Sequence, residues 1–428
     1  MENSRLVPVV ILTLIIFTCC MIPINILSKG YLPHDDALRH VAKVISGKEW
    51  NDILILKPEV RMDSHPGWHK ILELIYRVTD MNARSMVMLS VAMLFIWFAV
   101  IPAFFSDRPE AWLISLLIIS MSDFGSIQRL LLGRPYIFTM SWVVFLSFSW
   151  RKLRNRTVLP GVWIPLLLYS AAATWIHCNW SVFGFPVICF FLAGERRAAL
   201  NLSVILIIAV ILGACLTGHP FLFLKQTLLH GLTALSQIHR QYMLVSEFRS
   251  GAGTPVLIIA VILIILNRVS KDSEDSVLSN PIFIMAASGY VLQFSVLRFW
   301  YDIGFPALSV WIAIEIGEML KKNSDKFSWK RAGTVMFLCM TFYLYISNDY
   351  EDRWSTEWDK KFLVYENPAN REWLPEPGGI IYNLEMTAFI KFFIIILMRL
   401  GAMFLASSRQ SWQKKTSRSI RTYCLLRV

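Results

Sequence analysis

The sequence predicts an all-α integral membrane protein that crosses the bilayer about 12 times. Hydrophobic residues make up 55% of the 428-residue chain and charged residues only 17%, whereas a water-facing domain carries about 25% charged residues. The mean hydropathy is +0.51. Apolar runs near the length needed to cross a bilayer recur along the chain, with short basic runs between them.

The same composition excludes several other classes of protein. A chain this apolar is neither intrinsically disordered nor collagen-like. Seven cysteines are present, and no long loop holds a pair of them, which excludes a disulfide-stapled module and a CxxC metal site. The formal net charge is +12. Because the basic residues lie between apolar stretches, we expect no nucleic-acid partner.

Twelve segments are apolar enough to be transmembrane helices. The first is too long for a signal peptide and lacks a small-residue cleavage site. The third, sixth and eighth are short. The twelve are 6–28, 84–105, 110–122, 135–150, 158–176, 181–193, 198–217, 254–267, 281–297, 303–320, 331–347 and 384–406.

Charge sets the expected orientation. With the N-terminus in the cytoplasm, the inner connections are short and mostly basic, as the positive-inside rule requires. Residues 1–406 then form one transmembrane domain, and 407–428 form a basic cytoplasmic tail. The inner connections are 151–156, 195–197, 268–275 and 321–331, and the long outer segments are 29–83, 218–253 and 348–383.

All eight histidines lie in these outer segments or at outer helix ends. Histidine titrates near neutral pH and serves in acid–base, phosphate-binding and metal-binding sites. The asymmetry therefore places the chemistry on the outer side. The last outer segment, 348–383, is too polar to be embedded, and we expect it either to cover the site or to act as a tether.

The first outer loop predicts two amphipathic helices that lie along the membrane surface. From Asp36 onward apolar residues recur at helical spacing, and Gly47 ends the pattern. A second helix follows Pro66, and the polar run 61–69 surrounds its start.

An acidic pair, Asp35 and Asp36, stands at the start of the first of these helices. Aspartate at a helix N-terminus caps free amide groups and complements the helix dipole, which explains one acid well and two less well. A charge held near the hydrocarbon is costly, so residues of this kind tend to be functional. The sequence leaves both roles open.

The chain resembles the GT-C glycosyltransferases, such as the protein O-mannosyltransferases and the aminoarabinose transferases of lipid A. The resemblance lies in a first helix, a large outer loop that opens with this acidic pair, and many further spans. The resemblance implies an enzyme that transfers a sugar from a polyprenyl phosphate to a lipid, glycan or protein acceptor. It also implies a bacterial plasma membrane, with the site on the periplasmic side. By position, Asp35 or Asp36 would be the base that removes the acceptor proton, and Asp35 is favoured because it comes first.

The leaving phosphate needs fixed hydrogen-bond donors, a role that suits arginine, and the outer turns of several spans offer such groups. Each one taken alone can also be explained as an interfacial residue that reaches for lipid headgroups, and the aromatic residues beside them as an interfacial belt. Their presence at several independent turns favours a shared site. The candidates for substrate binding are Arg129, Arg134, His177, Arg298, His65, His219 and Tyr301.

Metal use is left open. Asp35, Asp36, Asp63 and His65 have the side chains to hold Mg²⁺ or Mn²⁺ if the fold brings them together. Many members of the superfamily that the chain resembles work without a metal, and the sequence implies no other cofactor.

Two other functions compete. O-antigen ligases and polymerases act outside on polyprenyl-diphosphate glycans through large late loops, whereas here the large acidic loop comes first. A transporter should have paired halves and charged or broken helices at mid-membrane. The sequence has no internal repeat, and the acids Glu315 and Glu318 lie toward the inner end of their span.

Overall fold

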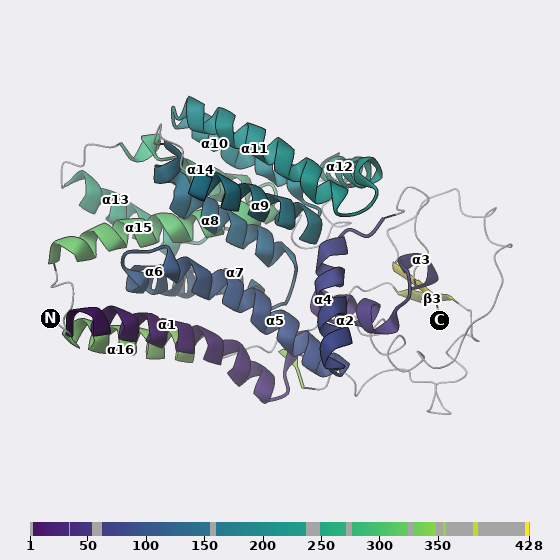
Figure 1. Cartoon of the computed structure of the whole chain (residues 1–428). Helices are drawn as coiled ribbons and strands as arrows, with labels where there is room; N and C mark the ends of the chain where they lie inside the picture. The colour runs from purple at the N-terminus through teal and green to yellow at the C-terminus, as the bar shows by residue number, and fades with distance from the viewer. Residues whose placement is uncertain are drawn as a thin grey trace.

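The computed structural model describes residues 3–33, 35–53, 62–154, 160–236, 249–270, 276–323, 329–347, 354–356, 380–383 and 424–427. These residues form a bundle whose long helices lie roughly side by side (Figure 1). The predicted all-α class is confirmed, and the strands among the described residues form two short pairs.

The helices follow the order of the sequence. They are α1 (Asn3–Ser28), α2 (Asp36–Ser46), α3 (Trp50–Ile53), α4 (Pro66–Thr79), α5 (Ala83–Val100), α6 (Pro109–Ser122), α7 (Phe124–Arg129), α8 (Tyr136–Arg154), α9 (Pro160–Ile176), α10 (Gly184–Leu192), α11 (Arg196–Cys215), α12 (Pro220–Ser236), α13 (Pro255–Val269), α14 (Pro281–Leu292), α15 (Phe305–Asn323) and α16 (Trp329–Ile346). Short helical turns are η1 (Ile101–Phe104), η2 (Trp180–Phe183), η5 (Val277–Ser279) and the π-helix η6 (Trp300–Gly304). The strands are β1 (Leu32–Pro33), β2 (Trp354–Ser355), β3 (Ile380–Asn383) and β4 (Cys424–Arg427), and β1 pairs with β2 and β3 with β4, both antiparallel.

Eleven of the twelve predicted apolar segments form helices whose ends agree with the prediction within a few residues. The twelfth, 384–406, and most of the basic tail lie outside the described residues. Four described segments are long and apolar enough to cross a bilayer, which supports a membrane protein. The count of crossings stays a prediction. The four are Leu6–Ser28, Ala83–Phe104, Arg196–Cys215 and Trp300–Lys321.

The surface of the bundle is also typical of a membrane protein. Helix α11 shows large apolar side chains to the outside at spacings of three or four residues, while Leu202 and Leu206 on its other face are buried. An exposed apolar stripe of this length would be unfavourable in water and is favourable against lipid. The exposed residues are Leu200, Val204, Ile207, Ile208 and Ile211.

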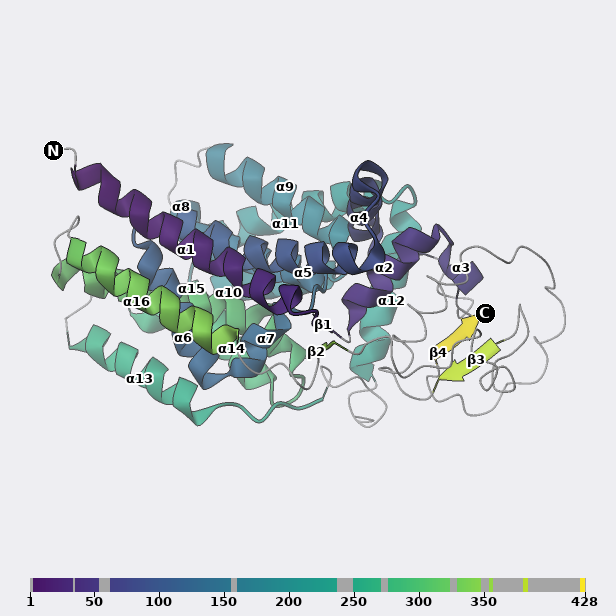
Figure 2. The same ribbon diagram turned by 90° about the horizontal axis from the view of Figure 1, so that it is seen from below.

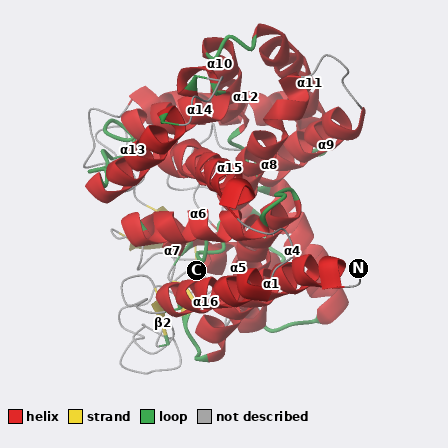
Figure 3. Ribbon diagram, turned by 90° about the vertical axis from the view of Figure 1, so that its left-hand side faces the viewer, coloured by secondary structure: helices red, strands yellow, loops and turns green. Residues whose placement is uncertain are grey.

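The predicted inner connections meet at the end of the bundle at which α1 begins. We call it the opposite end, because it lies away from helix α4. Figure 3 views the bundle from this end and shows α1 beside α16, with α6 and α15 next to them. Ion pairs join the connections there, so the basic runs predicted to lie in the cytoplasm share one side. The pairs are Arg331–Glu110, Arg268–Glu315, Arg151–Glu318, Arg154–Glu195 and Lys321–Asp107.

Three helices, α2, α4 and α12, lie across the bundle at its other end, which we call the α4 end (Figures 1 and 2). The two predicted amphipathic helices are confirmed as α2 and α4, and α2 ends at Gly47 in the left-handed conformation (φ 62°). The β1–β2 pair joins Leu32 and Pro33 to Trp354 and Ser355, which brings part of the last outer segment next to the start of α2. The rest of that segment is largely outside the described residues, so its role as cover or tether stays untested.

The segment 218–253 was predicted to be an outer loop, and its first half is instead helix α12. Apolar residues recur through this helix at helical spacing, but Lys225, Gln226 and His230 interrupt the run, which made it too polar to be read as a span. A helix that lies across the bundle end can carry both kinds of residue because one side faces the protein and its polar groups.

Candidate functional site

A cavity of about 680 Å³ lies at the α4 end. Its wall comes from the first outer loop, the turn before α8, the end of α9, the helices α10 and α12, and the segment between α14 and α15. Segments far apart in the sequence therefore bring their polar side chains to one space. The charged and imidazole side chains on the wall are Asp36, Arg39, Asp63, His65, Arg134, His177, His230, Arg298 and Asp302.

Asp35 and Arg134 form a two-point ion pair beside this cavity. Arg134 donates through Nε to one carboxylate oxygen of Asp35 and through Nη2 to the other, the second contact at 2.8 Å. Asp35 is only 3% exposed, and it also accepts from the backbone N–H of Asp36 at 2.6 Å. Burial raises the pKa of Asp35, and the Arg134 guanidinium opposes that shift. Asp35 thus caps α2 and fixes the direction of Arg134.

Asp36 has a different position. Among the described residues that line the cavity, Asp36 is present and Asp35 is not. The Asp36 carboxylate lies 3.2 Å from Arg39 and 3.7 Å from Arg134, and its side chain is 27% exposed. A general base must come within hydrogen-bond reach of the proton that it removes. The geometry therefore favours Asp36 over Asp35, whereas sequence order favoured Asp35.

Two glycines let these segments approach closely. Gly133 has φ +65°, and a Cβ there would come within 2.9 Å of Ala37 and of Val91. A side chain would push the Arg134 turn away from α2 and from Asp35. Gly67, at the start of α4, packs on the ring and carbonyl oxygen of Trp175 at the end of α9. That contact brings the α4 start next to the α9 end.

A second buried aspartate holds a second arginine on another part of the wall. Arg298 donates from Nε to Oδ2 of Asp302 at 2.8 Å, and Asn179 donates to the same oxygen at 3.2 Å. Asp302 is 3% exposed. Charge-assisted hydrogen bonds of this kind fix a guanidinium in one orientation. The cavity therefore carries two arginines, each held by a buried carboxylate.

Asp302 belongs to the π-helix η6, which directly precedes α15. A π-helical turn adds one residue to a helical turn and is often found at functional sites. Two contacts anchor the π-helix. Trp300 donates from Nε1 to Asp123 at 2.8 Å. Gly304 packs closely on Gly289 of α14, since a Cβ added to Gly289 would lie 2.5 Å from the Cα of Gly304. The turn thereby points Asp302 toward Arg298.

His177 lies beside Arg298 on the cavity wall. Its Nδ1 lies 3.0 Å from Thr139 Oγ1, and its Nε2 lies 3.4 Å from Nη2 of Arg298. The ring of His65 stacks on it, with the centroids 5.5 Å apart and the planes at 24°. His177 is 5% exposed overall but reaches the cavity wall.

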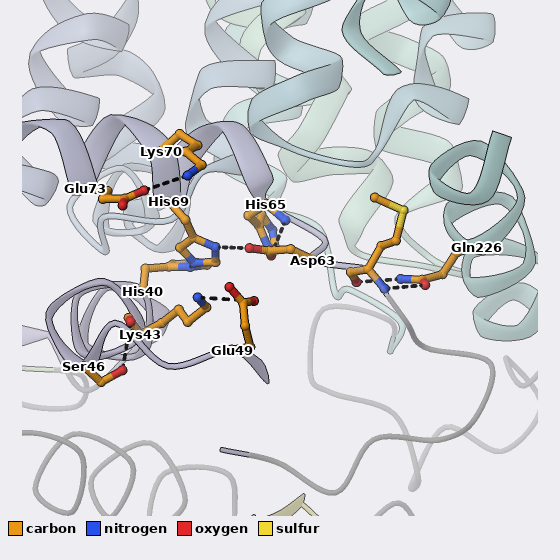
Figure 4. A network of polar contacts seen from close by, with 11 residues as sticks. His40, Lys43, Ser46, Glu49, Asp63, His65, His69, Lys70, Glu73 and Gln226 are labelled. Atoms are coloured by element: carbon orange, nitrogen blue, oxygen red, sulfur yellow. Dashed lines mark hydrogen bonds and ion pairs between the residues drawn. The ribbon is translucent and has the colours of Figure 1, made fainter. Parts of the chain in front are cut away.

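A chain of hydrogen bonds links Asp63 to two further histidines (Figure 4). Asp63 Oδ2 accepts a very short hydrogen bond from Nδ1 of His69, and Nε2 of His69 lies 2.8 Å from Nδ1 of His40. Burial is the largest single influence on the pKa of Asp63 and raises it, but the hydrogen bonds and charge interactions with His69 and His65 together outweigh burial and lower the pKa well below the ordinary value. Burial also lowers the pKa of His40. The chain joins α2 to α4.

His65 completes a group of four imidazoles. Its backbone N–H donates to Asp63 Oδ1 at 2.9 Å, and its ring meets His40 edge-on with the centroids 4.9 Å apart. Burial, with the neighbouring His69 and Arg39, lowers the pKa of His65 to about 3. The imidazole that faces the cavity is therefore neutral near neutral pH.

The structure brings four of the seven predicted substrate-binding residues to the cavity wall: Arg134, His177, Arg298 and His65. The other three do not line the cavity. Arg129 is buried behind the wall with its guanidinium 4.0 Å from the ring centroid of Tyr301, so the two pack on each other. His219 is exposed after α11, because the left-handed turn at Gly218 leads the chain away.

Sequence reasoning missed Asp302, Asn179, His40 and His69 as parts of the site. Asp302 stands four residues after Arg298, a spacing that places both on one helical face, and this signal was available. His40 meets His69 only because α2 packs on α4. No local pattern in the sequence encodes that contact.

One side of the cavity is apolar. It is lined by residues of η2 and α10 and of the segment after α14, namely Val182, Phe185, Ile188, Val296 and Phe299. Ile188 is 59% exposed, so the apolar wall continues to the lipid-facing surface. Helix α10 has nine residues, fewer than the number that crosses the hydrocarbon.

The possible Mg²⁺ or Mn²⁺ site was predicted from Asp35, Asp36, Asp63 and His65. Within the described ranges no group of three or more histidine, cysteine, aspartate or glutamate side chains is placed to hold a metal ion. Asp35 is engaged by Arg134 and Asp63 by His69. Metal use stays a prediction without geometric support.

No protein-family model matches the chain, and no curated protein is similar to it.

Proposed function

We propose that this protein is a membrane glycosyltransferase that moves a sugar from a polyprenyl-phosphate donor to an acceptor hydroxyl or amine. One observation carries the proposal. A single cavity combines a partly exposed carboxylate, two arginines held by buried aspartates, and an apolar wall that continues to the lipid-facing surface. These features match the three parts of such a reaction: the acceptor proton, the phosphate and the lipid chain.

The donor phosphate fits best at Arg298. This arginine precedes Phe299 of the apolar wall, so a lipid chain along that wall would place its phosphate beside the guanidinium. Asp302 and His177 each contact one nitrogen of Arg298, and a guanidinium fixed in this way on the cavity wall is a donor group suited to phosphate oxygens. Fixed donors stabilise the negative charge that grows on the leaving phosphate.

The acceptor fits at the polar end of the cavity, where Asp36 is the proposed base. The acceptor O–H or N–H bond breaks and its proton goes to the Asp36 carboxylate. The acceptor atom bonds to the anomeric carbon, and the bond from that carbon to the phosphate oxygen breaks with its electron pair left on the phosphate. Arg134, held by Asp35, places its positive charge 3.7 Å from the Asp36 carboxylate.

The proposal is tested in cells that lack this protein. Mass spectrometry of their surface glycans should show the loss of one sugar, and their lipid extract should accumulate a sugar linked to polyprenyl monophosphate. The wild-type gene should restore the glycan and Asp36→Asn should not. Asp107→Asn is the matched control, since this aspartate is 81% exposed at the opposite end. Unchanged glycans in the deleted strain would refute the proposal.

The lipid that accumulates also separates this function from that of a ligase or polymerase. Those enzymes use polyprenyl-diphosphate glycans, so their loss would lead to accumulation of a diphosphate-linked oligosaccharide. A transporter would instead alter the sidedness of a lipid or solute without the loss of a transfer activity.

A further inference from the structure

The proton position on His177 follows from its neighbours. An arginine has only hydrogen-bond donors, so the contact between Nη2 of Arg298 and Nε2 of His177, at 3.4 Å, requires a lone pair on Nε2. The proton of the ring is then on Nδ1, which donates to Thr139 Oγ1 at 3.0 Å. These hydrogen-bond roles correspond to a neutral imidazole at His177.

We propose that His177 is a positioning residue that holds Arg298 toward the cavity only while its imidazole is neutral, so that protonation of His177 weakens the binding of the donor phosphate. This inference rests on the proposed function, because it assigns Arg298 to the phosphate. Beyond the proposed function, it predicts that the binding of the sugar donor depends on the pH of the compartment that the cavity faces.

Protonation of His177 would change its Nε2 from a hydrogen-bond acceptor into a donor. A protonated imidazole carries N–H groups on both nitrogens, so Nε2 can no longer accept from Arg298. Two cations would also lie within 3.4 Å of each other. Arg298 already donates from Nε to Asp302 at 2.8 Å, and the freed guanidinium would turn further toward this buried carboxylate. Its donors would then leave the cavity.

Several other groups also lie around His177. His65, stacked on the ring from the start of α4, stays neutral near neutral pH because its pKa is about 3. Tyr136 meets the ring edge from α8 at 6.5 Å between centroids, and Thr139 of the same helix is neutral. Asn179 and Arg298 share the nearby carboxylate of Asp302.

The test measures binding rather than transfer. The probe is methyl polyprenyl phosphate, a phosphodiester without a sugar, whose charge is constant because it lacks the second proton of a phosphate monoester. Its affinity for the full chain in lipid nanodiscs is measured from about pH 5.5 to about pH 8.5, across the imidazole range. The wild-type protein should lose about tenfold in affinity toward acid pH, along a one-proton curve.

His177→Gln gives the decisive comparison. A glutamine can accept from Arg298 through its oxygen and donate to Thr139 through its nitrogen, so it keeps the arrangement without titrating. This variant should bind the probe within about threefold of the wild type at pH 8.5 and keep that affinity at acid pH. His219→Gln, in which an exposed histidine outside the cavity is replaced, should keep the wild-type curve.

The outcomes separate the two proposals. If the wild type binds the probe equally at all pH values, or if His177→Gln shows the same acid loss, the positioning role is overturned while the proposed function stands. If the wild type binds no probe at any pH, the proposed function itself fails. The thermal midpoint of each variant, measured at each pH, separates loss of binding from loss of fold.

Discussion

The guanidinium of Arg134 binds both carboxylate oxygens of Asp35, and the neighbouring Asp36 lines the cavity. Two adjacent acids therefore have different surroundings and different roles. Asp35 is buried and paired, which makes it the residue that positions Arg134. Asp36 is partly exposed, which makes it the residue that a substrate can reach.

Asp35→Asn should destabilise the protein. Removal of one partner from a buried ion pair costs about 3–5 kcal/mol in the free energy of unfolding, and the contact of Arg134 with Asp36 at 3.7 Å should reduce that cost here. Reversible unfolding in mixed micelles measures the change. The double variant Asp35→Asn with Arg134→Gln should be less destabilised than the sum of the two single variants, and strict additivity would contradict direct pairing.

Acid should destabilise the fold through the buried histidines. Burial lowers the pKa of His65 to about 3 and that of His40 well below its ordinary value. Below about pH 6.5 the unfolded chain therefore binds protons that the folded chain does not, and stability is lost as pH falls from there. Each histidine contributes about 1.4 kcal/mol per pH unit. The thermal midpoint in detergent should fall between about pH 6.5 and pH 4.5, and His65→Gln should make that fall shallower.

Arg298→Ala should weaken donor binding without a change of fold. Hydrogen bonds to a charged group contribute about 1.5–3 kcal/mol each, so the KM for the donor should rise by about tenfold to a hundredfold. His219→Ala is the control from the same set of sequence predictions, and its KM should be that of the wild type because the side chain is exposed outside the cavity. An equal effect of both variants would remove Arg298 from the phosphate site.

Arg331→Ala should lower stability with no effect on the donor KM. Arg331 donates to both oxygens of Glu110, at 2.6 and 2.7 Å, at the opposite end of the bundle. Glu110 is 4% exposed and also lies 3.5 Å from Arg108, so the loss of Arg331 leaves a buried carboxylate only partly compensated, at a cost of up to about 3 kcal/mol. A lower thermal midpoint with an unchanged KM is expected, and a changed KM would show that the two ends of the bundle are coupled.

The helices were predictable from the sequence because most are continuous apolar runs bounded by charged or turn-forming residues. Helix α12 was missed since Lys225, Gln226 and His230 break its apolar run, and these residues are tolerated because they lie at the cavity end of the bundle. Gln226, for example, exchanges two hydrogen bonds with the backbone of Met62, 164 residues earlier.

The site was predictable in its residue types and less so in its pairings. Arg134, His177 and Arg298 were expected because each stands at an outer turn. Their partners depend on tertiary packing. Asp35 meets Arg134 across 99 residues, and no periodicity within one segment reveals which of two adjacent acids will turn inward.

Sugar transfer by the purified protein in nanodiscs tests most directly whether it is a glycosyltransferase with Asp36 as its base. The donor is a polyprenyl-phosphate sugar. The acceptor is the lipid or glycan that lacks its sugar in the deleted strain. If Asp36 is the general base, the wild type transfers the sugar and Asp36→Asn does so at a rate about a hundredfold to ten-thousandfold lower, with donor binding intact, since general-base catalysis contributes on this scale. Wild-type rates in Asp36→Asn, or no transfer by a folded wild-type protein that binds the donor, would contradict this prediction.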